Sequence, residues 1–142
     1  MKETIRKKFV DFPYSLHDAR IHKIRIEAEK IVMYFSKGYY KPMNDDCVPV
    51  KGSPLISIAH TDLDFCVVYL IDLEGDHGRF SGEKISLEEF ISRFAEIDFE
   101  IVDETYGYNQ CKFSGYFYLD DTIKECIIEI YHFGDMTYIV ED

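Results

Sequence analysis

Two short segments of the chain place a histidine beside carboxylates, the residue types that acid–base or metal chemistry requires. His17 and Asp18 stand together just before the first predicted strand. His60, Asp62 and Asp64 occupy alternate positions of a second segment, so in an extended chain their side chains point to one side. An imidazole with two carboxylates is a ligand set that suits Zn²⁺ or Mn²⁺. The sequence therefore offers one His–Asp pair of unassigned role and one alternative metal site.

Both segments also have a structural interpretation. At a turn, the Asp18 carboxylate can accept hydrogen bonds from backbone N–H groups, and His17 can bond to a neighbouring strand. Residues 61–64 have the composition of an ordinary turn between two strands, and spacing alone does not create ligand geometry. We therefore favour structural roles and predict no metal and no cofactor. A metal-dependent enzyme or a metal-binding protein stays as the alternative.

The setting of the cysteines disfavours nucleophilic catalysis. Cys66, Cys111 and Cys126 lie in apolar strand-like patterns, whereas a reactive thiolate needs an electropositive and partly exposed setting. The chain has no C-x-x-C pair, no glycine-rich phosphate loop, no G-x-S-x-G elbow and no H-E-x-x-H motif. Its charged N-terminus is followed by no apolar signal segment. These features predict a cytoplasmic, non-enzymatic protein with reduced thiols.

Tyrosines and acidic residues together suggest a surface for protein binding. Tyr116 and Tyr118 share a strand face with polar residues, which is typical of the wetter side of a sheet. Tyrosine is enriched both at protein interfaces and in strands, so a purely structural role stays open. The predicted binding surface consists of Tyr39, Tyr40, Asp45, Asp46, Asp103, Glu104, Tyr106, Tyr108, Tyr116 and Tyr118.

The charge of the chain limits its partners. Sixteen Lys and Arg residues against 27 Asp and Glu residues give a formal net charge of −11. Nucleic-acid binders concentrate positive charge, and anionic membrane surfaces attract it, so both partners are disfavoured. A basic protein would be attracted, although acidity also serves solubility alone. We therefore predict a basic protein partner, no nucleic acid and no membrane.

The hydrophobic pattern predicts a strand-rich chain. Residues 36–54 contain three of the four prolines and read as a loop, and Gly134-Asp135 reads as a two-residue hairpin turn. Alternation or continuous apolar runs predict strands at 21–28, 31–35, 55–61, 65–73, 98–104, 111–119, 123–132 and 136–141.

One helix is predicted at residues 87–96. Ser86 and Glu89 form a capping box, and an apolar stripe with helical spacing follows at Leu87, Phe90, Ile91, Phe94 and Ala95. The predicted fold is α+β and spans residues 1–142 as a single domain. It is a mainly antiparallel, strongly curved or partly closed sheet of about seven or eight strands, packed on this helix.

Residues 14–36 resemble a group of small uncharacterised bacterial proteins. The shared features are a Leu-His-Asp-x-x-Ile leader, here Leu16 to Ile21, and a β-hairpin with an apolar second strand. Some of those proteins resemble immunity proteins that neutralise secreted toxins. The resemblance implies an immunity-like, protein-masking role in the bacterial cytosol, and it transfers no catalytic residue. The alternatives are the metal-dependent protein and a structural subunit that forms a homodimer through an edge strand.

Overall fold

The computed structural model describes residues 1–7, 12–73 and 81–141. Within these residues the chain is mostly strand, with one short 3₁₀ helix, η1 (Leu63–Phe65), and one α-helix, α1 (Leu87–Arg93). The strands are β1 (Lys2–Ile5), β2 (Arg20–Glu27), β3 (Lys30–Phe35), β4 (Tyr40–Met43), β5 (Asp46–Pro49), β6 (Leu55–Ile58), β7 (Val67–Asp72), β8 (Gly82–Ser86), β9 (Phe99–Gly107), β10 (Gln110–Tyr118), β11 (Ile123–Tyr131) and β12 (Met136–Val140).

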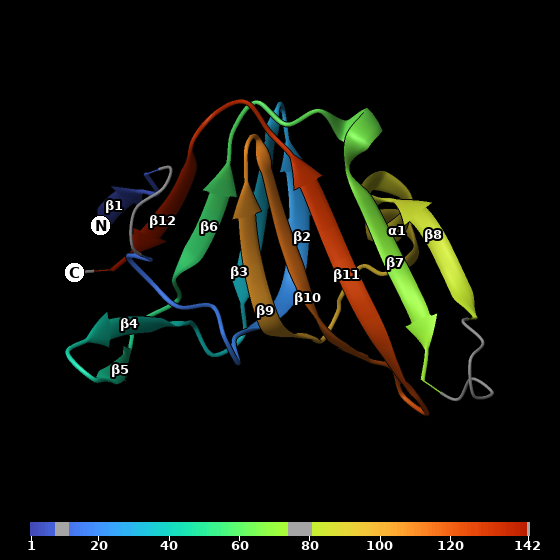
Figure 1. The fold of residues 1–142 in the computed structure, drawn as a ribbon, viewed down its shortest axis with the longest axis horizontal. Coiled ribbons are helices and arrows are strands. Elements are labelled where there is room, and N and C mark those ends of the chain that lie inside the picture. The colour runs from blue at the N-terminus through green and yellow to red at the C-terminus, as the bar shows by residue number, and fades with distance from the viewer. Residues whose placement is uncertain (8–11, 74–80, 142) are drawn as a thin grey trace.

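Ten of the strands in the described residues form one antiparallel sheet, in the order β1-β12-β6-β3-β2-β9-β10-β11-β7-β8 (Figure 1). The α+β, mainly antiparallel class is therefore confirmed. The predicted strand count and curvature are wrong, because the sheet has ten strands and is neither closed nor strongly curled. The edge strands β1 and β8 were not predicted, because both are short and carry charged residues, so they show little apolar alternation. Charged residues on an edge strand also disfavour its pairing with a strand of another chain.

The remaining two strands, β4 and β5, pair with each other inside the segment predicted to be a loop. Pro42 and Pro49 belong to this small sheet, where proline is tolerated because a two-stranded sheet has only edges. Asn44, with φ of 56°, makes the turn between the strands. The predicted loop at residues 36–54 is therefore wrong in part, because two short edge strands form within it.

The helix α1 begins where the sequence predicts and ends earlier. The Ser86 hydroxyl accepts a 3.0 Å hydrogen bond from the Glu89 N–H, as the capping box requires. The helix ends at Arg93 rather than at residue 96, because Phe94 turns to an extended conformation as the C-cap. Its ring then packs on those of Phe90 and Phe117, at 5.3 and 5.0 Å between centroids.

A bulge in β9 decides which of its side chains face the core. Ser114 pairs with Asp103, but Gly115 pairs with Ile101, so Val102 is the extra residue. A Cβ atom at Gly115 would clash with the carbonyl oxygen of Glu100, so only glycine fits this position. As a result Glu104 and Tyr106 pair with the buried Phe113 and Cys111 and face inward, whereas Asp103 faces outward.

The sheet consists of two five-stranded halves joined at β2 and β9 by only two residue pairs. The predicted hairpin at Gly134-Asp135 is wrong, because β11 pairs with β10 and β7, and β12 with β1 and β6. The chain instead crosses between the halves at Gly134, whose backbone lies close to Ala59 and His60. Buried apolar side chains from both halves form one core cluster.

No helix in the described part of the chain has the length and apolar character needed to cross a lipid bilayer.

Candidate functional site

The His17-Asp18 segment ties the start of β2 to β9. Leu16 is fully buried, and its N–H donates a 2.7 Å hydrogen bond to Oε2 of Glu104. Asp18 adopts a left-handed backbone with φ of 68°, and its N–H donates to the carbonyl of Ile101. Nδ1 of His17 lies 3.1 Å from Oδ2 of the neighbouring Asp18, and both side chains are exposed. The geometry of this segment is that of an anchored turn.

The residues of the alternative metal site are engaged separately. Nδ1 of His60 lies 3.1 Å from Oε2 of Glu29, while Oδ1 of Asp62 accepts the N–H of Asp64 and caps η1. Within residues 1–7, 12–73 and 81–141, no three His, Cys, Asp or Glu side chains lie in an arrangement that could hold a metal ion. The two His–Asp segments also lie at opposite ends of the sheet, before β2 and after β6 (Figure 1). The arrangement of these residues therefore does not favour the metal-dependent alternative.

The structure separates the residues of the predicted binding surface. Tyr39 is buried in the core and its hydroxyl donates to the carbonyl of Leu55, so it does not belong to an exposed surface. Glu104 and Tyr106 face inward from β9. The remaining members are at least partly exposed but lie apart: Tyr40, Asp45 and Asp46 in or beside the β4–β5 sheet, Tyr108 at the β9–β10 turn, and Asp103, Tyr116 and Tyr118 on the outer face of β9 and β10.

Glu104 is the centre of a half-buried polar cluster. Its Oε1 accepts a 2.6 Å hydrogen bond from the Tyr106 hydroxyl, and its Oε2 accepts the Leu16 N–H. Burial raises the pKa of Glu104, although these hydrogen bonds and the nearby Arg6 charge act in the opposite direction. The buried hydroxyl of Tyr138 approaches Tyr106 but makes no hydrogen bond of good geometry with the described residues. The cluster therefore holds the inner face of β9 in place.

Three exposed aromatic rings lie together at the end of the sheet that carries η1. Phe65 and Tyr131 have ring centroids 6.0 Å apart, and Tyr131 and Phe133 6.2 Å apart. Their exposed fractions are 63%, 36% and 63%. The backbone positions them, because the Asp62 N–H donates to the Tyr131 carbonyl and the Phe133 N–H to that of His60. These large aromatic side chains therefore pack against one another on the surface of the protein rather than in the core.

Acidic side chains adjoin this aromatic cluster. A shallow concavity of about 410 Å³ is lined by Phe133 together with Glu29, Asp62 and Asp64. We call the three rings and these three carboxylates the acidic–aromatic surface. Sequence reasoning missed it, although one signal was available: Ile130 is an inward residue of β11, so period 2 places Tyr131 and Phe133 on the outward side.

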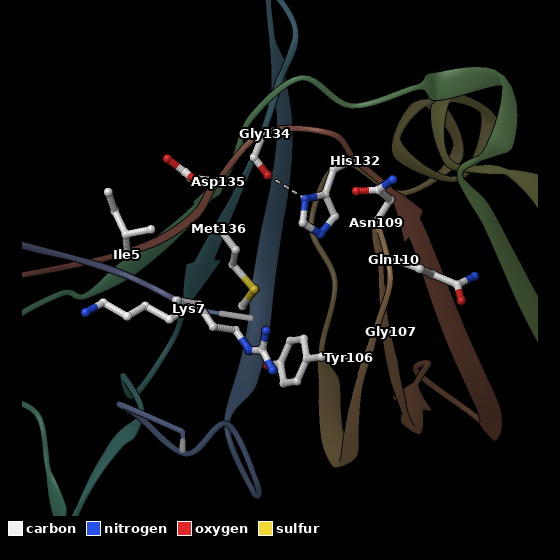
Figure 2. A pocket seen from close by; sticks show the side chains of 11 residues that line it. Ile5, Lys7, Tyr106, Gly107, Asn109, Gln110, His132, Gly134, Asp135 and Met136 are labelled. Carbon is white, nitrogen blue, oxygen red and sulfur yellow. Dashed lines mark hydrogen bonds between the residues drawn. The ribbon is translucent and has the colours of Figure 1, made fainter. Parts of the chain in front are cut away.

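A second hollow is lined by His132 and Gly134, the sequence neighbours of Phe133. It has a volume of about 340 Å³, and its walls include Arg6, Tyr106, His132 and Met136 (Figure 2). The Arg6 guanidinium lies 3.8 Å from the centroid of the Tyr106 ring, a distance at which cation and ring attract each other. This basic pocket therefore differs in charge from the acidic–aromatic surface beside it.

Three of the cysteines are core residues, as the sequence predicts; Cys111 and Cys126 lie in strands, and Cys66 lies between η1 and β7. Cys66, Cys111 and Cys126 are fully buried. Burial raises the pKa of all three thiols, that of Cys126 to about 12. Because the thiolate is the reactive form, these side chains act as small apolar groups rather than as nucleophiles.

Comparison with known proteins adds no relative, because no family model, no curated protein and no solved structure matches the chain.

Proposed function

We propose that this chain is a non-enzymatic protein-binding module that captures a basic protein through its acidic–aromatic surface. The observation that carries the proposal is the contact between three exposed aromatic rings beside a concavity walled by carboxylates. A partner that covers such rings gains about 1.5–3 kcal/mol for each large apolar side chain fully removed from water. Central aromatic anchors with a polar rim are typical of binding hot spots.

The charge of the chain indicates the sign of the partner. The net charge is −11, and Glu29, Asp62 and Asp64 bring carboxylates next to the aromatic anchors. Complementary charge steers the diffusional encounter of two proteins and disfavours partners of like charge. The same charge disfavours association of two copies of this chain through this surface. The partner is accordingly a protein with a basic face.

The resemblance of residues 14–36 to immunity-like bacterial proteins suggests a biological setting for this binding. An immunity protein must mask its toxin in the bacterial cytosol, and a nuclease toxin carries the positive charge that nucleic acid binding requires. An acidic surface with aromatic anchors suits that task. We therefore propose a basic toxin, such as a nuclease, as the partner class.

The proposal is tested with the partner recovered by affinity capture from lysate of the source organism at low and high salt. Phe133→Ala should speed dissociation of that complex by about tenfold or more, because buried aromatic anchors set the lifetime of a complex. The matched control is Tyr116→Ala, which truncates an exposed aromatic residue on the outer face of β10. Surface-based kinetics measures both rates.

The control separates two surfaces that differ in their place on the sheet. If Tyr116→Ala speeds dissociation and Phe133→Ala does not, the outer face of β10 is the interface and the acidic–aromatic surface is not. Light scattering on the isolated chain tests the homodimer alternative. A stable dimer that Phe133→Ala dissociates would show that these rings serve self-association instead.

A further inference from the structure

The basic pocket combines positive charge with an apolar wall. Figure 2 shows it between the segment that follows β1, the β9–β10 turn and the start of β12. The apolar part of the wall comes from Ile5, Met136 and the ring of Tyr106, and the basic part from Arg6 and Lys7. In a protein with a net charge of −11, Arg6 presents a positive charge beside the Tyr106 ring, while the Lys7 side chain extends away from His132 and Tyr106 at the rim of the hollow (Figure 2).

Arg6 is held so that its guanidinium takes part in the pocket. Its backbone N–H donates a 2.8 Å hydrogen bond to the carbonyl of Met136, and its guanidinium stacks on Tyr106 at 3.8 Å from the ring centroid. The Nε atom is buried and has no hydrogen-bond partner among the described residues. A buried donor without a partner is costly and therefore calls for an acceptor. A planar guanidinium binds carboxylate oxygens through paired N–H groups.

The acidic groups near Arg6 do not fill this role. The Glu104 charge interacts with that of Arg6, but the two oxygens of Glu104 accept their hydrogen bonds from Tyr106 and Leu16 and none from Arg6. The side chain of Asp135 lines the pocket but points away from the space between His132 and Tyr106 (Figure 2).

Nδ1 of His132 lies 2.9 Å from the carbonyl of Gly134. Because a carbonyl only accepts, this nitrogen carries a proton and the ring orientation is set.

We propose that the basic pocket binds a small organic carboxylate with a short apolar tail. The carboxylate would pair with the Arg6 guanidinium, with Lys7 at the rim adding charge. The tail would lie against Met136, Ile5 and the Tyr106 ring. The volume of about 340 Å³ is at the lower end of the range of small-molecule pockets, which also combine apolar walls with a few polar groups. This site is distinct from the acidic–aromatic surface, and its existence does not depend on the proposed protein partner.

The test uses hexanoate as the probe, with hexanol and inorganic phosphate as comparisons. Hexanol keeps the tail without the charge, and phosphate keeps the charge without the tail. Binding is measured by titration of amide chemical shifts in two-dimensional NMR. Hexanoate should shift the amides of Lys7, Gly107 and Met136 in a saturable manner. Both comparison compounds should bind at least about tenfold more weakly, because each lacks one of the two contacts.

Variants locate the site on Arg6. Arg6→Gln should weaken hexanoate binding by about tenfold or more, since it removes the charged pairing group. The control is Arg25→Gln, which removes an exposed arginine stacked on Tyr34 outside the pocket, and it should leave binding unchanged. Lys7→Glu, a substitution at an exposed side chain, should also weaken hexanoate binding. It replaces Arg6→Gln as the test variant if Arg6→Gln impairs folding.

Three outcomes would overturn the assignment. The first is equal binding of hexanoate and hexanol, which would show an apolar hollow without charge recognition. The second is phosphate binding as tightly as hexanoate, which would indicate a site for inorganic anions. The third is unchanged hexanoate affinity in folded Arg6→Gln or Lys7→Glu.

Discussion

Single side chains in this protein take roles that their chemical type alone does not reveal. Asp103 and Glu104 are neighbours of like charge, but the bulge at Val102 exposes Asp103 to solvent and places the half-buried Glu104 on the core-facing side of the sheet. Glu104 then holds the Leu16 N–H and the Tyr106 hydroxyl. A carboxylate at this position therefore contributes to the fold rather than to the surface charge that a partner meets.

The raised pKa of Glu104 has a consequence for stability. Because the folded state binds a proton at Glu104 more tightly than the unfolded chain does, proton binding stabilises the fold. This stabilisation is fully present below the ordinary glutamate pKa of about 4.3. It is lost as the pH rises through the raised pKa of the folded state. Glu104→Gln removes this titration, while its amide can still accept the Leu16 N–H and donate to the Tyr106 oxygen.

The free energy of unfolding of Glu104→Gln, minus that of the wild type, should therefore increase between about pH 4 and pH 8. Urea denaturation at a series of pH values measures this difference. Glu125→Gln, at an exposed position of β11, is the control and should show no comparable rise. A difference for Glu104→Gln that is constant or falls with pH would contradict the assigned role of this carboxylate.

At the scale of elements, α1 stabilises the fold through a few aromatic contacts. The helix has seven residues, too few to be stable in isolation. Its capping serine satisfies one N–H group, and its buried face is Leu87 and Phe90. Phe90 packs at 5.5 Å from Phe117 of β10. The helix therefore depends on the sheet that it covers.

Phe90→Ala should lower the free energy of unfolding by about 3–5 kcal/mol, because it removes a fully buried ring and leaves a cavity. Phe94→Ala should cost less, since Phe94 is only partly buried as the C-cap residue. Urea melts of both variants give the comparison. Equal costs, or a larger cost for Phe94→Ala, would show that the helix end rather than its buried face anchors α1.

At the scale of the whole molecule, the net charge of −11 acts over longer distances than any single contact. Exposed charges are screened beyond about 8 Å at physiological ionic strength, so the effect of the acidic–aromatic surface on association should depend strongly on salt. Dissociation depends more on the buried aromatic contacts. The two rate constants therefore report on different parts of the same surface.

Glu29→Lys combined with Asp64→Lys should slow association with a basic partner and reduce its salt dependence, because the variant loses local attraction. The matched control is Asp45→Lys with Asp46→Lys, which makes the same change of net charge beside the β4–β5 turn. Stopped-flow association rates at several salt concentrations measure the effect. Equal slowing by both pairs would mean that overall charge, and not the acidic–aromatic surface, directs the encounter.

The local sequence pattern was sufficient to predict those helices and strands whose signals lie within a few residues. Alternation predicted strands close to β2, β3, β10, β11 and β12, because period 2 is a property of the strand itself. The capping box located the start of α1 for the same reason. The burial of Cys66, Cys111 and Cys126 was also predictable, since each stands at an apolar position of a strand-like pattern.

Pairing between strands that are distant in sequence could not be predicted from such local patterns. The short strands β1 and β8 are strands because β12 and β7 pair with them, and not because of their own composition. The last two strands look like a hairpin in sequence, yet β12 pairs with β6 and β1 in the other half of the sheet. Strand order is a property of distant backbone groups, which local alternation does not encode.

The candidate site shows the same division. The acidity and the wealth of aromatic residues could be read from composition, and they predicted a basic partner. Which residues meet was decided by tertiary structure. Tyr39 entered the core, Glu104 turned inward at a bulge, and Phe65 joined Tyr131 and Phe133 across a distance of more than 60 residues in sequence. A surface is formed by residues that the packing of separate strands brings together, so its members become known only when that packing is known.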